Sequence, residues 1–305
     1  MDFTSFTELV KLEVSKKLGD GCKVQINDVQ KNNGIVLRGL TITQGNSNIS
    51  PTIYLNNHFT EYTNGNETIS DAVSYVLDTY NKNKICQCVD MRYFLNFEDV
   101  KSRIVFKLIN TERNKALLED IPHIEFLDLS IVFQCLVLQE EFGLCSILIH
   151  NVHLKLWDVT KEELYQAAKE NTPKLMPFQI KSMQQVLFEI IKKENPEAYS
   201  SDDCPEQYIN HIPMFVLSNK HKVEGASCIL YPNALHDFAN TINSSFYIIP
   251  SSIHEVLLLP AETFEESTNI LSMIQEINDT QVSVEEILSY SLYFYDKEED
   301  KIIKV

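Results

Sequence analysis

The sequence predicts an α+β fold made mostly of antiparallel strands joined by hairpins, with helices packed on one side. Three observations lead to this prediction. Several segments alternate apolar and polar residues, other segments repeat apolar residues at helical spacing, and short connections join neighbouring strand segments. The chain has 305 residues, of which 44% are hydrophobic, so the apolar material suffices for a substantial core.

The first part of the chain mixes helical and strand patterns. An amphipathic helix is predicted from Phe3 to Leu18, and residues 22–42 follow as a hairpin with turn residues near its middle. The apolar stripe from Ile69 to Tyr80 predicts a second helix. A third helix is predicted from Phe97 to about Leu118.

The most regular strand pattern lies in the middle of the chain. Residues 126–138 and 144–157 alternate at period two and are joined by a short connection, which predicts a long antiparallel hairpin. On such a strand His150 and His153 point to opposite faces, so they cannot both bind one metal ion. Thr160 and Glu163 have capping-box spacing and begin a helix. Another helix is predicted over residues 177–193.

Residues 196–211 are polar and acidic and contain two prolines, which favours a linker or long surface loop. This segment would separate a region 1–195 from a region 212–305, with one continuous domain as the alternative. The remaining elements follow from the same patterns. They are strands near 213–218, 226–232, 245–250 and 254–260, a helix near 233–242, helix starts at Thr263–Glu266 and Ser283–Glu286, and a closing hairpin with the acidic turn 296–300.

Composition restricts the partners and the location. With 43 acidic and 26 basic residues the formal charge is −17, which repels phosphate backbones, so general nucleic-acid binding is not expected. No stretch approaches the roughly 18 apolar residues that a membrane span needs, and the N-terminus lacks a signal-peptide pattern. The seven scattered cysteines fit a reduced compartment. A cytoplasmic location and a protein or small-molecule partner are therefore expected.

The sequence shows no familiar motif for binding a metal ion or a cofactor. There is no glycine-rich phosphate loop, so no nucleotide cofactor is expected. Cys86 and Cys88 have one intervening residue and no second pair, which does not fit a zinc knuckle. The stretch "HEVLL" begins like a zincin helix, but Leu258 stands where the second histidine is needed. No metal site is expected.

The candidates for chemistry gather in two turns. If residues 251–259 are extended, neighbours two apart lie about 7 Å from each other, too far for a serine–histidine hydrogen bond. The favoured interpretation is a polar turn at the entrance of a buried strand. If the segment has chemistry, the catalytic candidates are Ser251, Ser252, His254 and Glu255. The basic cluster of residues 218–222 supplies the binding candidates Asn219, Lys220 and Lys222.

Asp128 interrupts an apolar run next to the predicted long hairpin. A partly buried carboxylate there needs a partner and could have a raised pKa. A structural ion pair is the favoured interpretation.

Several motifs point to a family. They include "KNNG" (31–34), "FVLSNK…GAS-x-ILY" (215–231) and "IPSSIHEVLLLP" (249–260). With these the chain resembles an uncharacterised domain-of-unknown-function family of clostridial and other gut Firmicutes. It is also loosely similar to a second uncharacterised family of bacilli, whose corresponding turn lacks the Ser–Ser–x–His–Glu combination. The resemblance implies a bacterial cytoplasmic setting and brings no established activity.

The favoured function is a non-enzymatic cytosolic binding or interaction protein. The alternative is a metal-independent hydrolase or transferase centred on the turns 218–222 and 250–255. An enzyme would need a concave pocket in which His254 or Glu255 meets polar groups from distant segments. A binding protein would have the side chains of these turns tied into the turns themselves.

Overall fold

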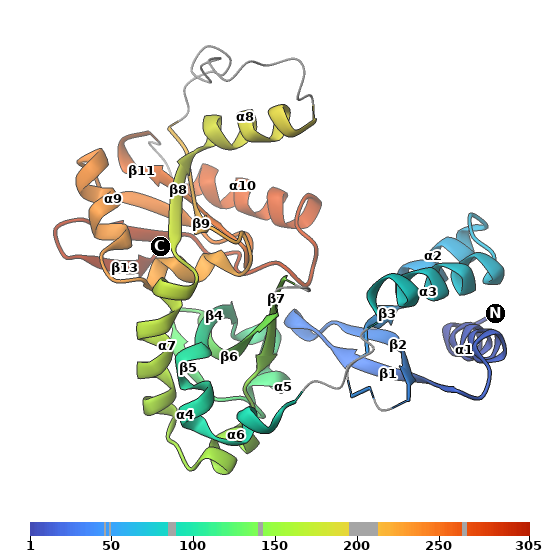
Figure 1. Ribbon diagram of the computed structural model, residues 1–305. Coiled ribbons are helices and arrows are strands. Elements are labelled where there is room, and N and C mark those ends of the chain that lie inside the picture. Colours follow the sequence, from blue (N-terminus) through green and yellow to red (C-terminus); the bar gives the residue numbers. More distant parts are fainter. Residues whose placement is uncertain (46, 49, 85–89, 140–142, 195–212, 264–266) are drawn as a thin grey trace. The chain divides into compact units, whose positions relative to one another are not determined.

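The computed structural model describes the chain except residues 46, 49, 85–89, 140–142, 195–212 and 264–266. The described residues form two compact units, Met1–Tyr93 and Phe94–Val305, and Figure 1 shows helices and sheets in both. All strand pairs between named strands are antiparallel, which confirms the predicted α+β class.

The first unit combines helices with a three-stranded sheet of order β1-β2-β3. Its strands and helices are α1 (Phe3–Leu18), β1 (Cys22–Gln30), β2 (Val36–Gln44), β3 (Thr52–Tyr54), α2 (Asn56–Asn64) and α3 (Ile69–Asn83). Phe6 and Val10 of α1 and Val76 of α3 are buried in one cluster with Leu40 and Ile42 of β2. The predicted N-terminal helix, hairpin and second helix are confirmed.

The second unit contains two sheets. In the four-stranded sheet, β6 pairs with each of the other three strands, and in the six-stranded sheet the order is β13-β12-β10-β11-β9-β8. The first sheet consists of β4 (Ile104–Asn110), β5 (His123–Phe126), β6 (Leu129–Gln139) and β7 (Gly143–Leu148). The second consists of β8 (Phe178–Ser182), β9 (Phe215–Asn219), β10 (Phe246–Ile249), β11 (Val256–Pro260), β12 (Tyr293–Asp296) and β13 (Lys301–Lys304).

Helices of the second unit connect these strands. They are α4 (Phe97–Val100), α5 (Lys115–Leu118), α6 (Asn151–Trp157), α7 (Lys161–Leu175), α8 (Met183–Glu194), α9 (Ala234–Ile242) and α10 (Ser267–Thr280), with a 3-10 helix η6 (Gly225–Leu230) after β9. The capping box of Thr160 and Glu163 at the start of α7 is confirmed.

Helices cover both faces of the six-stranded sheet, rather than one side as expected. On one face, Ile270 and Ile274 of α10 pack against Ile249 and Leu259. On the other, the ring of Phe238 in α9 lies 5.0 Å from the ring of Phe246 and 5.0 Å from that of Phe215. The reason is that the central strands of this sheet carry apolar residues at consecutive positions, so both faces must be covered.

Several elements differ from the sequence-based prediction. The helix expected from Phe97 to Leu118 is wrong, because β4 occupies its centre. Strand β4 is a run of apolar and β-branched residues buried on both faces, and such a run does not reveal its secondary structure by periodicity. The helix expected over 177–193 is β8 followed by α8, and the strand expected near 226–232 is mostly the 3-10 helix η6.

Two further predicted segments differ from the structure. The long hairpin is formed by β6 and β7, but its second strand ends at Leu148 and α6 follows. Ser283–Glu286 forms a turn instead of a helix start, whereas Thr263–Glu266 lies partly outside the described residues. The predicted linker 196–211 lies wholly outside them and stays a prediction. Strands β8 and β9, which flank it, pair with each other.

Asp128 joins the two sheets of the second unit. Its carboxylate accepts hydrogen bonds from the hydroxyls of Ser289 (2.6 Å), Tyr293 (2.7 Å) and Ser291 (3.0 Å), and Lys304 lies 3.9 Å away. Burial alone would raise the pKa of Asp128, but these hydroxyl groups outweigh it and hold the pKa below its usual value. The carboxylate is therefore a charged structural partner.

Candidate functional site

The turn before β11 is fixed by its own backbone and by a neighbouring segment. The Ser252 hydroxyl accepts a hydrogen bond from the His254 backbone N–H at 3.0 Å, and the Ile253 N–H donates to the Glu286 carbonyl at 2.9 Å. Ser251 and Ser252 are each 6% exposed. These two serines are therefore buried parts of a turn and are not presented to solvent.

Both ring nitrogens of His254 are engaged. Its Nδ1 accepts a hydrogen bond from the backbone N–H of Glu224 at 3.2 Å, which places the proton of the neutral ring on Nε2. Nε2 lies 3.4 Å from the carboxylate of Glu286. A general base needs a free nitrogen that faces a nucleophile. His254 instead connects the turn 250–255 to Glu224 and to Glu286.

The 218–222 turn contacts the same turn. The Ser218 hydroxyl donates a hydrogen bond to the His254 carbonyl at 2.7 Å. The buried Asn219 side chain closes its own turn, because it accepts from the His221 N–H at 3.0 Å and donates to the Val223 carbonyl at 2.6 Å. Lys220 and Lys222 are exposed. Of the binding candidates, Asn219 is thus structural and the two lysines reach solvent.

Gly225 lies where the two turns meet. A Cβ atom at this position would lie 2.3 Å from the Ser218 hydroxyl oxygen and 2.6 Å from both the Asn219 nitrogen and the His254 carbonyl oxygen. Two of these three neighbours are backbone atoms, which cannot turn aside. Glycine is therefore required for the close approach of the segments that carry the two most specific sequence motifs.

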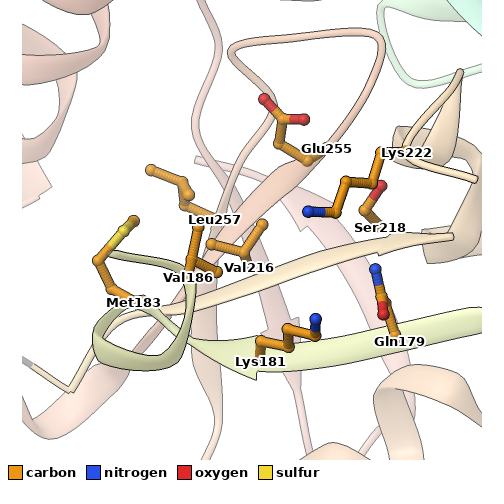
Figure 2. Close-up of a pocket in the computed structure, with 9 residues that line it drawn as sticks. All are labelled: Gln179, Lys181, Met183, Val186, Val216, Ser218, Lys222, Glu255 and Leu257. Carbon is orange, nitrogen blue, oxygen red and sulfur yellow. The ribbon is translucent and has the colours of Figure 1, made fainter. Parts of the chain in front are cut away.

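A pocket of about 260 Å³ lies on the six-stranded sheet next to these turns, between strand residues and α8. Figure 2 shows its polar side chains gathered apart from its apolar ones. The polar residues are Gln179, Lys181, Ser218, Lys222 and Glu255. The apolar residues are Met183, Val186, Val216 and Leu257. The volume is close to the lower limit of about 300 Å³ for small-molecule sites.

Glu255 is the acidic group of this pocket. Burial raises the pKa of Glu255, with the charges of His254 and Lys222 opposing the rise and that of Glu286 adding to it. Among the described residues none donates a hydrogen bond to its carboxylate. On the opposite side, Lys181 is hydrogen-bonded to Glu189 of α8, and the Lys222 ammonium lies 3.7 Å from the same carboxylate.

The structure thus separates the sequence candidates. Glu255 and Lys222 line the pocket, while Ser251, Ser252, His254, Asn219 and Lys220 do not. Lys181 and Gln179 also line it and were missed, because the segment 177–193 was predicted to be helical throughout. Their alternation with Ile180 is a period-two signal, but β8 is only five residues long.

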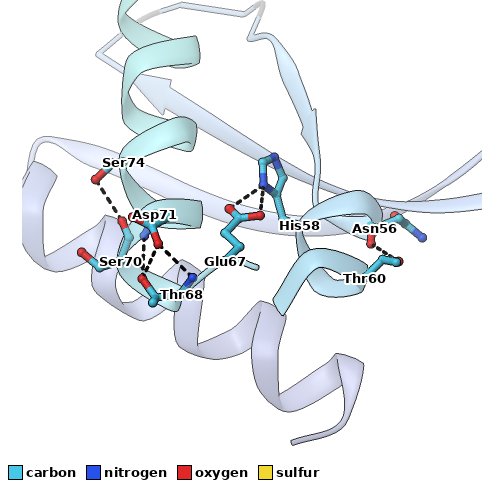
Figure 3. Close-up of polar contacts among 8 residues, drawn as sticks. All are labelled: Asn56, His58, Thr60, Glu67, Thr68, Ser70, Asp71 and Ser74. Carbon is cyan, nitrogen blue, oxygen red and sulfur yellow. Dashed lines mark hydrogen bonds and ion pairs between the residues drawn. The ribbon is translucent and has the colours of Figure 1, made fainter. Parts of the chain in front are cut away.

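A second polar cluster lies in the first unit (Figure 3). His58 Nδ1 lies 2.8 Å and 3.0 Å from the two carboxylate oxygens of Glu67, and each side chain is 15% exposed. The His58 ring also contacts the Tyr75 ring, with 4.3 Å between centroids. Thr68 and Asp71 beside it form the capping box of α3. The pair of His58 and Glu67 joins α2 to the start of α3, which gives it a structural role.

The two histidines near residue 150 are not on a strand, so the predicted arrangement on opposite strand faces is wrong. They form the start of α6, where the His150 N–H donates to His153 Nδ1 at 3.0 Å. His150 Nδ1 lies 2.6 Å from the Asp120 carboxylate. Burial lowers the pKa of His153, and the charge of His150 adds to this effect while that of Asp120 opposes it.

Within the described part of the chain, no group of three or more histidine, cysteine or acidic side chains is arranged to hold a metal ion. No helix in the same part of the chain has the length and apolar character to cross a membrane.

No curated protein and no solved structure matches this chain. A family described as "Family of unknown function (DUF5688)" matches residues 3–297, which is nearly the whole sequence. The chain therefore belongs to the DUF5688 family, as the resemblance to an uncharacterised family predicted.

Proposed function

We propose that this chain is a non-enzymatic binding protein and that its ligand is a small amphipathic molecule held in the pocket between α8 and the edge of the six-stranded sheet. The observation that carries the proposal is the hydrogen bonding of His254. Both of its ring nitrogens have partners, and its neighbours Ser218 and Ser252 are hydrogen-bonded to backbone groups. These hydrogen bonds therefore hold the turns 218–222 and 250–255 together.

The pocket provides the binding side of the proposal. Four apolar side chains offer a surface for a hydrocarbon group, and two lysines and a carboxylate stand beside them. Binding sites for small molecules commonly combine a mostly apolar lining with a few polar groups that fix orientation. A small ligand with an apolar body and a charged or polar head matches this arrangement.

The alternative is a metal-independent hydrolase or transferase that uses the same turns. It would need a nucleophile next to a base with a free nitrogen or oxygen. Glu255 could serve as a base, but no serine or cysteine side chain is hydrogen-bonded to it within the described residues 213–263. We therefore favour binding without chemical conversion.

The experiment blocks the pocket and follows both binding and conversion. L-leucine, 4-methylpentanoate, 3-methylbutylamine and 3-methylbutanol serve as small amphipathic probes, and thermal stabilisation of the protein reports binding. Val186→Trp fills the pocket, whereas Ile190→Trp adds the same ring to an exposed position of α8, where Ile190 is 49% exposed.

At least one probe should raise the melting temperature of the wild type and of Ile190→Trp, but not that of Val186→Trp. Mass spectrometry should recover the probe unchanged after incubation. Failure of all four probes, or equal binding by Val186→Trp, would refute the pocket as a ligand site. A converted probe would favour the enzyme alternative.

We also propose a bacterial cytoplasmic setting. It is supported by the family resemblance and by the acidic composition of the chain. Fractionation of bacterial cells that produce the full-length chain should place it with cytosolic marker proteins, and recovery with the membranes would contradict this setting.

A further inference from the structure

The charges that line the pocket are arranged in two separate groups. Lys181 and Lys222 both face the single carboxylate of Glu189. The two ammonium groups share this one carboxylate, and the charge of Lys222 also acts on Glu255. Glu255 lies on another wall, where it precedes β11, and within the described residues its carboxylate receives no hydrogen bond. The pocket therefore presents one cationic group and one carboxylate to the same space.

The carboxylate of Glu255 has nearby charges but, among the described residues, no hydrogen-bond donor. It is partly buried, and burial of a carboxylate is unfavourable unless hydrogen-bond donors or a cation compensate for the lost water. The raised pKa of Glu255 reflects this cost. A ligand that brings an ammonium group would supply both a positive charge and hydrogen-bond donors. The hydroxyl oxygen of Ser218, which also lines the pocket, can accept a further hydrogen bond.

The apolar part of the lining favours a branched hydrocarbon group. Met183 and Val186 come from α8, while Val216 and Leu257 are neighbours on β9 and β11. These side chains are aliphatic or carry a thioether, so they match a short aliphatic chain in shape and polarity. With a pocket volume of about 260 Å³ the ligand must be small.

We propose that the pocket binds an α-amino acid with an aliphatic side chain as its zwitterion. The α-ammonium group pairs with Glu255, the α-carboxylate pairs with Lys222 and Lys181, and the side chain lies against Met183, Val186 and Leu257. This inference rests on the proposed function and names the ligand class of the same pocket.

A zwitterion fits better than a singly charged ligand because of the charges that remain unpaired. A carboxylate without an amino group would bring no hydrogen-bond donor to Glu255 and would add a second negative charge near it. An amine without a carboxylate would pair with Glu255 but would give Lys181 and Lys222 no ligand group to bind. Each missing pair should weaken binding at least about tenfold, as expected for hydrogen bonds to charged groups.

The test removes one group of the ligand at a time. Isothermal titration calorimetry at neutral pH compares L-leucine with 4-methylpentanoate, which lacks the amino group, with 3-methylbutylamine, which lacks the carboxylate, and with glycine, which lacks the side chain. L-leucine should bind at least about tenfold more tightly than each of the other three.

Variants of the protein assign each ligand group to its partner. Glu255→Gln should weaken L-leucine binding about tenfold or more and leave 4-methylpentanoate binding unchanged or tighter. Lys222→Gln should weaken L-leucine binding and leave 3-methylbutylamine binding unchanged or tighter. The matched controls are Glu262→Gln and Lys220→Gln, both at exposed positions outside the pocket, and both should bind L-leucine like the wild type. Unchanged circular dichroism and melting show that each variant is folded.

The outcomes separate this inference from the proposed function. Equal or tighter binding of 4-methylpentanoate or 3-methylbutylamine would overturn the zwitterion and keep a ligand-binding pocket. L-leucine binding that survives in both Glu255→Gln and Lys222→Gln would also overturn it. If none of the probes binds, both the inference and the proposed function fail.

Discussion

Replacement of Gly225 by alanine should strongly destabilise the second unit. The added methyl group would lie 2.3 Å from the Ser218 hydroxyl oxygen and 2.6 Å from two backbone atoms, Asn219 N and His254 O. The serine side chain can rotate, but this breaks its hydrogen bond to His254. The backbone contacts can be relieved only if β9, η6 and the turn 250–255 move apart.

The expected cost follows from these two contributions. Overpacking a close-packed site typically costs about 1–3 kcal/mol. Loss of one hydrogen bond adds about 0.5–1.5 kcal/mol. We therefore expect Gly225→Ala to lower the free energy of unfolding by about 2–4 kcal/mol and the melting temperature by about 4–16 °C.

Urea unfolding followed by tryptophan fluorescence measures this cost. Trp157 is the single tryptophan of the sequence, it belongs to the second unit, and it is 7% exposed, so its emission reports unfolding of that unit. Gly21→Ala is the control, because a Cβ there meets nothing within 4 Å. By circular dichroism it should change stability by less than about 1 kcal/mol. A loss below about 1 kcal/mol for Gly225→Ala would refute the close approach of the two turns.

Three further predictions concern the contacts around the pocket and in the core. Asp128→Asn should lower the free energy of unfolding by about 2–3 kcal/mol at neutral pH. The pKa of Asp128 is lowered in the folded state, so the carboxylate stabilises the protein above its unfolded pKa of about 3.9. This stabilisation is lost as the pH falls through the pKa of the folded state. Urea titrations at neutral and acidic pH should show the difference shrinking, and a constant difference would contradict it. His254→Ala should lower the free energy of unfolding by about 1–2 kcal/mol through the lost Glu224 hydrogen bond and leave the L-leucine affinity unchanged. The control is His236→Ala, at an exposed position. Lost affinity without lost stability would contradict the structural role of His254. Burial raises the pKa of Cys135 to about 11 and that of Cys228 to about 12, so iodoacetamide should alkylate the exposed Cys145 in the folded protein and spare these two until urea is added, as peptide mass spectrometry would show.

The sequence predicted those elements whose residues show an amphipathic pattern. Helices α1 and α3 and the hairpin β1–β2 each have one buried face, so their periodicity is visible without any tertiary information. Strand β4 is buried on both faces, and its apolar run was mistaken for part of a helix. The 3-10 helix η6 was predicted as a strand for a similar reason, because five of its six residues are buried and show no alternation of buried and exposed positions.

The pocket was only partly visible in the sequence for a physical reason. Glu255 and Lys222 stood out because charged residues next to apolar runs are conspicuous. Lys181 and Gln179 come from the edge strand β8, which pairs with β9 more than 30 residues later in the sequence. No local sequence pattern indicates such a long-range pairing. The partners of His254 are of the same kind, since Glu224 and Glu286 lie 30 and 32 residues away from it.

The two specific motifs and the pocket depend on each other through one residue. Glu255 directly follows His254 and precedes β11, so its direction is set by a turn in which the backbone N–H and carbonyl of His254 are bonded to the hydroxyls of Ser252 and Ser218. Side chains alternate along a strand, and a shift of one residue would turn Glu255 away from the pocket and Val256 toward it. The hydrogen bonds of the turn prevent that shift, and so does the close packing that Gly225 permits. A segment that carries serines and a histidine can therefore serve binding without reacting, because it positions the carboxylate that follows it.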